Sequence, residues 1–334
     1  MKKRHLALGT AGAIGGLIAW KMLTRARTVN FADFADRIAH AENSHFAEVD
    51  GMTVHYQEFG DAANPTLILI HGYTSSTYVW RKAAPRFAEA GFHVVAVDLL
   101  GFGFSEKPAW FDYSIASQAR VLVRLMNVLG IGRATLVGSS FGGAVASTVA
   151  LDYKERVEKL VLIGSVCNDD VKNQPILKLA AIPLVGEVIT PFLTDSKAFM
   201  RHRMKNTLAP ENHHLITDER IENIIRPLKA ADAHHAILQT ARSWEACRIE
   251  TDAQFIEQPT LLVWGDKDRV IPMQNGERLH NSILNSRFVV FKNCGHIPQE
   301  ENPGLFVDLV AEFCRDSKGR IDAKDDKGIS DFQS

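Results

Sequence analysis

A segment near the middle of the chain constrains the fold more than any other. An apolar run over residues 134–137 is followed by Gly138-Ser139-Ser140-Phe141-Gly142, and residues 144–151 then have the composition of a packed helix. Glycines two residues before and two residues after Ser140 predict a turn so sharp that neighbouring backbone leaves no room for a Cβ atom. The segment therefore predicts a buried strand, a tight turn with Ser140 exposed at its tip, and a helix.

The same residues match the Gly-x-Ser-x-Gly pattern of a nucleophile elbow, in which a strand-to-helix turn presents a reactive serine. Ser139 does not fit the centre of this pattern, because Val137 stands where the first glycine is required. The alternative interpretation is a glycine-rich turn in which a serine only caps the following helix. Ser140 is therefore a candidate nucleophile, and its partners must come from other parts of the chain.

Polar motifs follow several other apolar runs. His71, Asp98, Asp268 and His296 each come shortly after an apolar run with the length of a buried strand, and helical segments separate most of these runs. Buried strands that alternate with helices predict a mostly parallel sheet covered on both faces. Ligands of such sheets bind beyond the carboxyl ends of the strands. We therefore expect these motifs and Ser140 to meet at one edge of the sheet.

A base and a carboxylate are available to the candidate serine. A serine hydroxyl is a weak nucleophile at neutral pH and needs a base within hydrogen-bond reach, which a carboxylate orients in turn. Asp266 and Asp268 follow one predicted strand, and His296 follows the last one. Alternatively, the two aspartates are turn residues that cap a helix. The chain order Ser, Asp, His is the order of a known arrangement of such triads.

From His45 to Cys314 the chain resembles the α/β-hydrolases that carry a helical cap. The motifs that carry the resemblance are His71-Gly72, Asp98 with Gly101-Phe-Gly-Phe-Ser105, Gly138-Ser-Ser-Phe-Gly-Gly143, Trp264-Gly with Asp268 and Pro272, and Gly295-His296.

The resemblance implies a role for each matching residue. Ser140 is expected to be the nucleophile, and His296 the base that later protonates the leaving group. Asp268, rather than Asp266, is expected to orient His296. The backbone N–H groups of Tyr73 and Phe141 are expected to form the oxyanion hole.

The implied fold is an α/β-hydrolase fold with a mostly parallel, eight-stranded sheet, helices on both faces and a helical cap inserted after the sixth strand. Residues 45–167 and 255–315 are expected to form the core, and residues 168–254, which hold helical patterns and several prolines, the cap. Residues 316–334 are polar and charge-rich, which predicts a disordered tail.

Residues 1–28 form a separate N-terminal segment in which basic residues flank an apolar run over residues 6–23. The uncharged part, residues 6–20, would be about 22 Å long as a helix, short of a hydrocarbon core of about 30 Å unless the flanking lysine snorkels. No small-x-small cleavage site stands near Trp20. We therefore expect a single-span membrane anchor, with a cleaved signal peptide of an exported protein and a peripheral tail as alternatives.

Composition excludes some classes of function. A formal net charge of −1 gives no indication of nucleic-acid binding. The four cysteines lack metal-ligand spacing, and adjacent histidines such as His213 and His214 would point in different directions on a helix, so we expect no metal. Acyl transfer by a serine triad needs no cofactor.

These features predict a serine hydrolase that cleaves carboxylic esters. Apolar segments over residues 176–185 and 188–193 of the cap, together with the apolar N-terminus, favour a hydrophobic, lipid-like acyl ester, as in enzymes similar to monoacylglycerol lipases. Packing of these segments onto the core is the alternative explanation for their apolar character.

Two other functions stay open. Hydrolases that cleave C–C bonds of aromatic ring-fission products have a similar layout. They usually carry Asn before the nucleophile and Trp after the histidine, where this chain has Ser139 and Ile297. A receptor for a hydrophobic ligand, built on the same fold, is the third interpretation.

Overall fold

The computed structural model describes residues 26–316 and 330–332. The strands within these residues form one sheet in the order β1-β2-β4-β3-β5-β6-β7-β8-β9. Strand β2 is antiparallel to β1 and to β4, and the other neighbouring pairs are parallel, which confirms the predicted, mostly parallel sheet. The predicted number of strands was eight, and the described sheet has nine. The strands are β1 Ser44–Val49, β2 Met52–Phe59, β3 Thr66–Ile70, β4 His93–Val97, β5 Ala134–Ser139, β6 Val157–Ile163, β7 Thr260–Gly265, β8 Ser286–Phe291 and β9 Ser330–Phe332.

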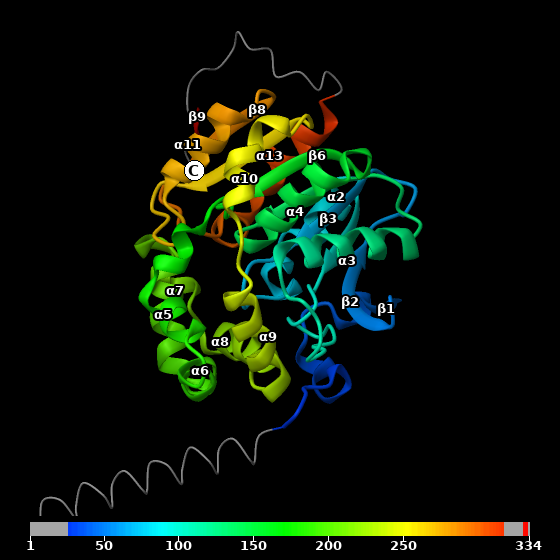
Figure 1. Ribbon diagram of the computed structural model, residues 1–334. Coiled ribbons are helices and arrows are strands. Elements are labelled where there is room, and N and C mark those ends of the chain that lie inside the picture. The colour runs from blue at the N-terminus through cyan, green and yellow to red at the C-terminus, as the bar shows by residue number, and fades with distance from the viewer. Residues whose placement is uncertain (1–25, 317–329, 333–334) are drawn as a thin grey trace, which may run out of the picture.

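Alternate residues of the central strands face opposite layers of helices, because side chains in a strand point to the two faces in turn. In β3, Ile68 and Ile70 belong to an apolar cluster with helices α3, α4 and α11, whereas Leu67 and Leu69 pack with α2 and α13 on the other face (Figure 1). The helices of the core are α2 Ala84–Glu89, α3 Ile115–Val128, α4 Phe141–Asp152, α11 Met273–Ser282, α12 Pro298–Glu301 and α13 Pro303–Arg315.

A helical insertion lies between β6 and β7, which confirms the cap predicted after the sixth strand. Its helices α5 to α9 gather at one end of the molecule, below the sheet in Figure 1. The helices of the insertion are α5 Pro175–Ala181, α6 Val185–Asp195, α7 Lys197–Thr207, α8 Asp218–Ile225, α9 Ala231–Arg242 and α10 Cys247–Asp252. Short 3₁₀ helices complete the chain: η1 Phe31–Arg37, η2 Ala41–Asn43, η3 Thr77–Trp80, η4 Lys154–Arg156, η5 Asp169–Asn173, η6 Pro210–Leu215, η7 Arg226–Leu228 and η8 Ala253–Phe255.

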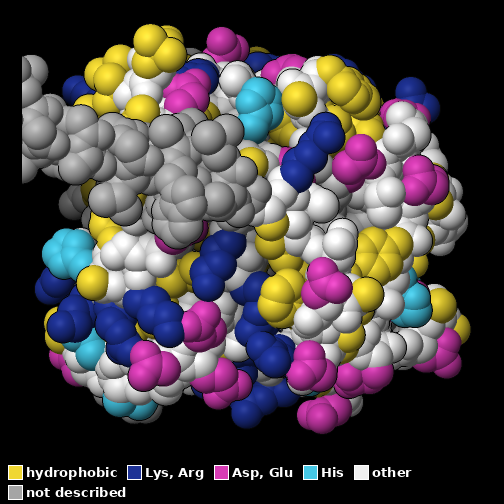
Figure 2. Space-filling model, turned by 90° about the horizontal axis from the view of Figure 1, so that it is seen from below, with side chains coloured by type: hydrophobic (Ala, Val, Ile, Leu, Met, Phe, Trp, Pro, Cys, Tyr) yellow, Lys and Arg dark blue, Asp and Glu magenta, His cyan; other side chains and the backbone are white. Residues whose placement is uncertain are grey.

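Part of the apolar character of the cap lies on its outer surface. Leu184 is 81% exposed, and Leu179, Ile182 and Phe192 are each more than 40% exposed. Figure 2 shows the end of the molecule at which the cap helices lie, where apolar, basic and acidic side chains are intermixed. Packing onto the core therefore does not account for all the apolar side chains of the cap.

Two expectations about the chain termini are corrected. The predicted membrane span over residues 6–23 lies outside the described residues. Within 26–316 and 330–332, no helix is both long and apolar enough to cross a bilayer. The longest described helix, α3, has 14 residues, about 21 Å against a hydrocarbon core of about 30 Å. The prediction of a membrane-anchored protein is therefore not supported.

The predicted disordered tail over residues 316–334 contains three residues that the structure describes as a strand. Ser330–Phe332 pairs in parallel with β8 as β9. Without β9, the backbone N–H and C=O groups along the outer edge of β8 would have no partner in the sheet. A polar segment can pair with such an edge, because the pairing uses backbone groups and not side chains. Composition alone did not reveal this contact.

A buried ion cluster joins the cap to the core. Glu300 of α12 is 4% exposed and forms ion pairs with Arg81, which follows η3, and with Arg220 of the cap helix α8. The Arg220 Nη2 atom lies 2.9 Å from Glu300 Oε2, and Arg220 is 3% exposed. Arg220 is buried and the Arg81 side chain is 15% exposed, so the single carboxylate compensates one buried charge and one largely buried charge.

We expect Glu300→Gln to lower the free energy of unfolding by about 3 kcal/mol or more, because it leaves buried guanidinium groups without a counter-charge. Urea unfolding followed by circular dichroism measures the change. Asp152→Asn is the matched control: Asp152 pairs with the exposed Arg248, so its loss should cost less than about 1 kcal/mol. Equal effects of the two substitutions would contradict a structural role for the buried cluster.

Candidate active site

The turn after β5 has the strained geometry that its glycines predict. Ser140 has φ 55° and ψ −116°, a backbone conformation that residues other than glycine rarely adopt. A Cβ atom on Gly138 would lie 2.4 Å from the carbonyl oxygen of Gly142, and one on Gly142 would lie 2.3 Å from that of Ile70. The backbone of β3, β5 and α4 thus meets too closely at this point for any larger residue.

A hydrogen-bonded aspartate and histidine lie at the same edge of the sheet. Asp268 Oδ2 is 2.8 Å from His296 Nδ1, and both side chains are almost fully buried. The other oxygen, Asp268 Oδ1, accepts the backbone N–H groups of Val270 and Ile271 at 2.8 and 2.9 Å. The carboxylate is therefore held in one orientation. Since it can only accept a hydrogen bond when ionised, Nδ1 of His296 carries the proton and Nε2 is left as an acceptor.

Asp266, the competing aspartate, has a different role. Its Oδ1 atom accepts the backbone N–H of Cys294 at 3.2 Å, and the residue is exposed. It therefore ties the turn after β7 to the loop that precedes His296. The geometry agrees with the expectation that Asp268, rather than Asp266, contacts the histidine.

The end of β6 brings the turn at Ser140 and the ring of His296 to one place. The Ser140 N–H donates to the carbonyl of Ile163 at 2.8 Å, and the Val166 N–H donates to the Ser140 carbonyl at 3.1 Å. Between these two contacts lies Gly164, on which a Cβ atom would approach His296 Nδ1 to 2.8 Å and Asp268 Oδ2 to 3.1 Å. Residues 163–166 therefore contact both halves of the candidate site.

The expected oxyanion donors lie beside Ser140. Phe141 is the first residue of α4, where a backbone N–H has no acceptor within its own helix. Gly72, which directly precedes Tyr73, is so close that a Cβ atom on it would lie 3.1 Å from Ser140 Cβ and 3.7 Å from Ser140 Oγ. The loop after β3 and the start of α4 thus flank the serine on two sides.

His71 supports this loop. Its Nε2 atom accepts the backbone N–H of Leu99 at 3.1 Å, so Nδ1 must carry the proton that it donates to the Gly72 carbonyl at 2.7 Å. Burial lowers the pKa of His71, which keeps the ring neutral in this arrangement. With both ring nitrogens engaged, His71 holds the loop in place.

Asp98 organises the neighbouring loop. It accepts hydrogen bonds from His55 Nδ1 at 2.7 Å, from the Thr77 N–H at 2.6 Å and from the Phe104 N–H at 2.9 Å. Burial opposes ionisation of Asp98, but the contact with His55 and these donors hold the pKa of its carboxyl below the usual value. Asp98 is therefore a structural anchor of the Gly101–Ser105 loop.

The sequence offered no sign of Glu301, which binds the backbone of the loop before His296. Glu301 Oε1 accepts the Gly295 N–H at 2.9 Å, and its Oε2 accepts the Ala209 N–H at 2.9 Å and the Asn212 amide at 2.7 Å. Glu301 therefore links the loop before His296 to the cap. A glutamate in a short helix, three residues after Pro298, belongs to no sequence motif that predicts this contact.

Cys294 is buried, with 2% of its surface exposed. Burial raises the pKa of its thiol well above the usual value, so the thiolate is disfavoured at neutral pH. Cys294 is therefore a packing residue rather than a reactive thiol.

The histidine pairs contact ordinary polar partners. His214 Nδ1 lies 3.0 Å from the Glu211 carbonyl, His234 Nε2 lies 2.8 Å from Thr194 Oγ1, and His235 Nε2 lies 3.2 Å from the Ala109 carbonyl. Within residues 26–316 and 330–332, no group of three or more His, Cys, Asp or Glu side chains could hold a metal ion.

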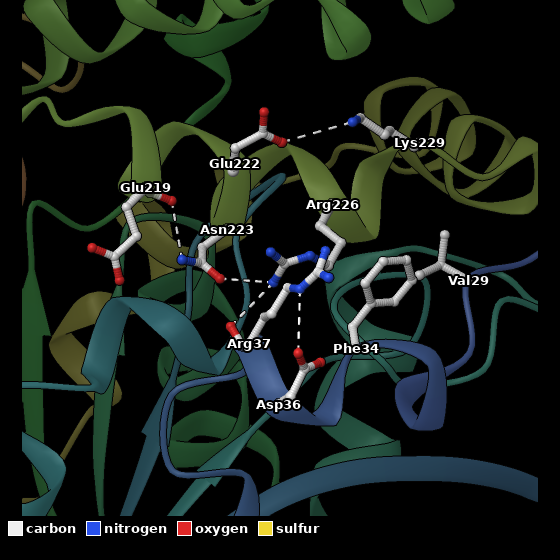
Figure 3. A pocket seen from close by; sticks show the side chains of 9 residues that line it. All are labelled: Val29, Phe34, Asp36, Arg37, Glu219, Glu222, Asn223, Arg226 and Lys229. Carbon is white, nitrogen blue, oxygen red and sulfur yellow. Dashed lines mark hydrogen bonds and ion pairs between the residues drawn. The ribbon is translucent and has the colours of Figure 1, made fainter.

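A pocket of about 580 Å³ lies away from the candidate site, between η1 and the cap helix α8 (Figure 3). Its charged side chains interact with one another: Lys229 lies 3.8 Å from Glu222, and Arg226 Nη1 donates to Asn223 at 2.8 Å. None of Ser140, Asp268 and His296 lines it. The pocket therefore lies where η1 packs on the cap, and it is separate from the site at the sheet edge.

Comparison with known proteins places the chain among hydrolases. Residues 65–303 match the family model of the alpha/beta hydrolase fold. A Bacillus subtilis protein, the hydrolase YugF, is 30% identical over 268 residues, which cover 80% of this chain and 96% of that protein.

Two further relatives are named for a substrate. The 2-hydroxy-6-oxononadienedioate/2-hydroxy-6-oxononatrienedioate hydrolase of Burkholderia vietnamiensis is 31% identical, and the match covers 84% of this chain and 99% of that one. The crystal structure of a membrane phospholipase A aligns with a TM-score of 0.70 at 26% identity, over 94% of this chain and 98% of that one.

We expect Asp268→Asn to slow the labelling of the protein by a fluorophosphonate by about three to four orders of magnitude, because an amide no longer selects the tautomer of His296 that leaves Nε2 free to accept a proton. Labelling at several times, resolved on a gel, measures the rate. Asp266→Asn is the matched control and should change the rate far less. If the control lost as much reactivity as Asp268→Asn, the assignment of Asp268 alone as the residue that orients His296 would be contradicted.

Proposed function

The chain belongs to the α/β-hydrolase fold family and is a hydrolase, and we propose that it cleaves carboxylic esters with apolar acyl groups through an acyl-enzyme on Ser140. The observation that carries the proposal is the hydrogen bond between Asp268 and His296 at the sheet edge where the strained turn holds Ser140. A buried aspartate that fixes the tautomer of a histidine beside a serine in an elbow supports nucleophilic acyl transfer.

In the proposed first step, Ser140 Oγ attacks the carbonyl carbon of the ester while His296 Nε2 accepts the hydroxyl proton. The tetrahedral intermediate places negative charge on the former carbonyl oxygen. The backbone N–H groups of Tyr73 and Phe141 would stabilise this charge, and the loss of one such donor costs about 3–4 kcal/mol in the transition state.

Collapse of the intermediate expels the alcohol, which takes the proton from His296, and leaves the acyl group on Ser140. In the second half-reaction, His296 removes a proton from water, and the resulting hydroxide attacks the acyl-enzyme. The carboxylic acid departs, and the proton returns to Ser140. Asp268 keeps the imidazole in the orientation that both half-reactions require and stabilises its charged form.

Aromatic rings around the expected oxyanion donors support an apolar acyl group. The ring of Tyr73 packs edge-on against Phe102 and Trp244, with centroids 5.9 and 5.6 Å apart, and Phe141 lies 5.1 Å from Trp244. Trp244 belongs to the cap, so core and cap together provide an apolar wall beside Ser140. The similarity to a phospholipase A over most of both chains agrees with an ester substrate.

Cleavage of a C–C bond is the alternative, and the name of the Burkholderia relative favours it. Against it stand Ser139 and Ile297, at the positions where such enzymes usually have Asn and Trp. Ser139 is buried and accepts a hydrogen bond from Gln299 at 3.1 Å, so its hydroxyl is engaged away from the elbow. Disappearance of the absorbance of a 2-hydroxy-6-oxodienoate, at a rate above ester hydrolysis, would establish the alternative.

We expect kcat/KM for p-nitrophenyl esters to rise with acyl length from acetate to octanoate. Burial of each added methylene contributes up to about 0.8 kcal/mol, which raises kcat/KM roughly fourfold, until the acyl chain extends past the apolar wall. Release of p-nitrophenol measures the rate. Ser140→Ala should reduce hydrolysis to the background, whereas the matched control Ser139→Ala should retain it. An unaltered rate in Ser140→Ala, or a series without dependence on acyl length, would contradict the proposal.

A further inference from the structure

The cap helix α7 ends directly on the loop that carries His296. The His296 N–H donates to the carbonyl of Thr207 at 2.7 Å, and a Cβ atom on Gly295 would lie 2.4 Å from that same oxygen. Thr207 Oγ1 in turn donates to the carbonyl of Arg203, one helical turn earlier, at 3.0 Å. Residues four apart share one face of a helix. Arg203 therefore lies one helical turn before the end of α7 that contacts the His296 loop.

Arg203 differs from the other arginines of the cap in having no partner. Its guanidinium forms no hydrogen bond or ion pair with any residue in the described ranges 26–316 and 330–332. By contrast, carboxylates pair with the cap arginines Arg201, Arg220, Arg242 and Arg248.

Arg203 is partly enclosed by protein. The residue keeps an intermediate accessible surface, between the buried Met200 and Met204. Burial nevertheless lowers the pKa of its guanidinium, so protein surrounds the charged group while solvent still reaches the residue. Even so, an arginine remains charged at neutral pH.

Tyr73, an expected oxyanion residue, lies within electrostatic range of this charge. Burial raises the pKa of the Tyr73 hydroxyl, and the positive charge of Arg203 acts against that rise, so the two groups lie within electrostatic range. The Tyr73 hydroxyl itself donates to the Ile237 carbonyl at 2.7 Å and is thereby engaged. Arg203 thus lies on the helix that ends at the His296 loop and within electrostatic range of Tyr73, and its guanidinium donors have no partner among the described residues.

We propose that Arg203 is a specificity-determining residue that binds an anionic group of the substrate, a carboxylate or a phosphate, beside the ester held at Ser140. The inference rests on the proposed function and adds the substrate class: an ester with an apolar acyl part and one negatively charged group. A buried, unpaired cation is unfavourable for folding, and the planar fork of a guanidinium matches carboxylate and phosphate oxygens. A charged substrate would supply the missing partner.

The test compares esters that differ only in charge. One pair is p-nitrophenyl pentanoate and mono-p-nitrophenyl glutarate, which have acyl chains of equal length, and the second pair is 1-butyrylglycerol and 1-butyrylglycerol 3-phosphate. The quantity measured is the ratio of kcat/KM for the anionic ester to kcat/KM for the neutral one. Arg203→Gln should lower this ratio about 10- to 100-fold in one of the two pairs, mainly through KM, because a charge-assisted hydrogen bond is lost. The pair that responds identifies the anion.

Two further variants control the result. Arg203→Lys keeps the charge without the planar fork and should recover part of the ratio. Lys205→Gln removes a charge from an exposed position on the same helix and should leave the ratio unchanged. Arg203→Gln should also raise the midpoint of thermal unfolding, because it removes a half-buried charge that has no partner among the described residues. A structural role of Arg203 predicts a lower midpoint instead.

The outcomes separate this inference from the proposed function. If Arg203→Gln is folded and hydrolyses both pairs with the wild-type ratios, the role of Arg203 is refuted while ester hydrolysis stands. If wild-type protein hydrolyses none of the esters, the proposed function fails. Calorimetric titration of Ser140→Ala with glutarate and with glycerol 3-phosphate then tests anion binding by Arg203. We expect at least tenfold weaker binding when Arg203→Gln is added to Ser140→Ala. Equal binding by the two proteins would refute the role of Arg203.

Discussion

The close approach of three backbone segments at the carboxyl edge of the sheet is the constraint on which the rest of the structure depends. At Gly138 and Gly142 the turn after β5 contacts itself and the end of β3, and at Gly164 the end of β6 contacts the Asp268–His296 pair. A methyl group at any of these positions would lie within about 3 Å of backbone or of the histidine. Because β3, β5 and β6 are neighbours in the sheet, their ends can meet only where these small residues stand.

The histidine of the site is held by the core and by the cap at the same time. Its side chain is oriented by Asp268 of the core, whereas its backbone N–H donates to Thr207 of the cap. Glu301 binds the preceding residue, Gly295, and two groups of the cap, and the neighbouring Glu300 pairs with Arg220 of the cap. The position of His296 and the seating of the cap are therefore set by one connected group of contacts, in which a displaced cap would also displace the base.

Local pattern was sufficient wherever the physical reason was local. The elbow at Ser140 follows from two glycines and a strand-to-helix change within ten residues, and the mostly parallel sheet follows from buried runs that alternate with helices. The position of the cap after β6 was visible because strand patterns stop there and resume at β7. By contrast, β9 joins β8 through backbone hydrogen bonds, which any side-chain composition permits, so a polar tail gave no indication of it. The predicted span over residues 6–23 lies outside the described residues, and no described helix is able to cross a bilayer.

The sequence by itself determined which residue types were available and in what order: a serine between glycines, an aspartate and a histidine that follow strands, and no metal-binding pattern. Only the tertiary structure decided which of Asp266 and Asp268 contacts His296 and that Glu301 holds the loop before it. It also decided that Arg203, within electrostatic range of Tyr73, has no partner among the described residues. The physical reason is distance along the chain. Arg203 and Tyr73 are brought together by the folding of the cap over the sheet, and the absence of a nearby carboxylate is a property of three-dimensional surroundings, which no local pattern records.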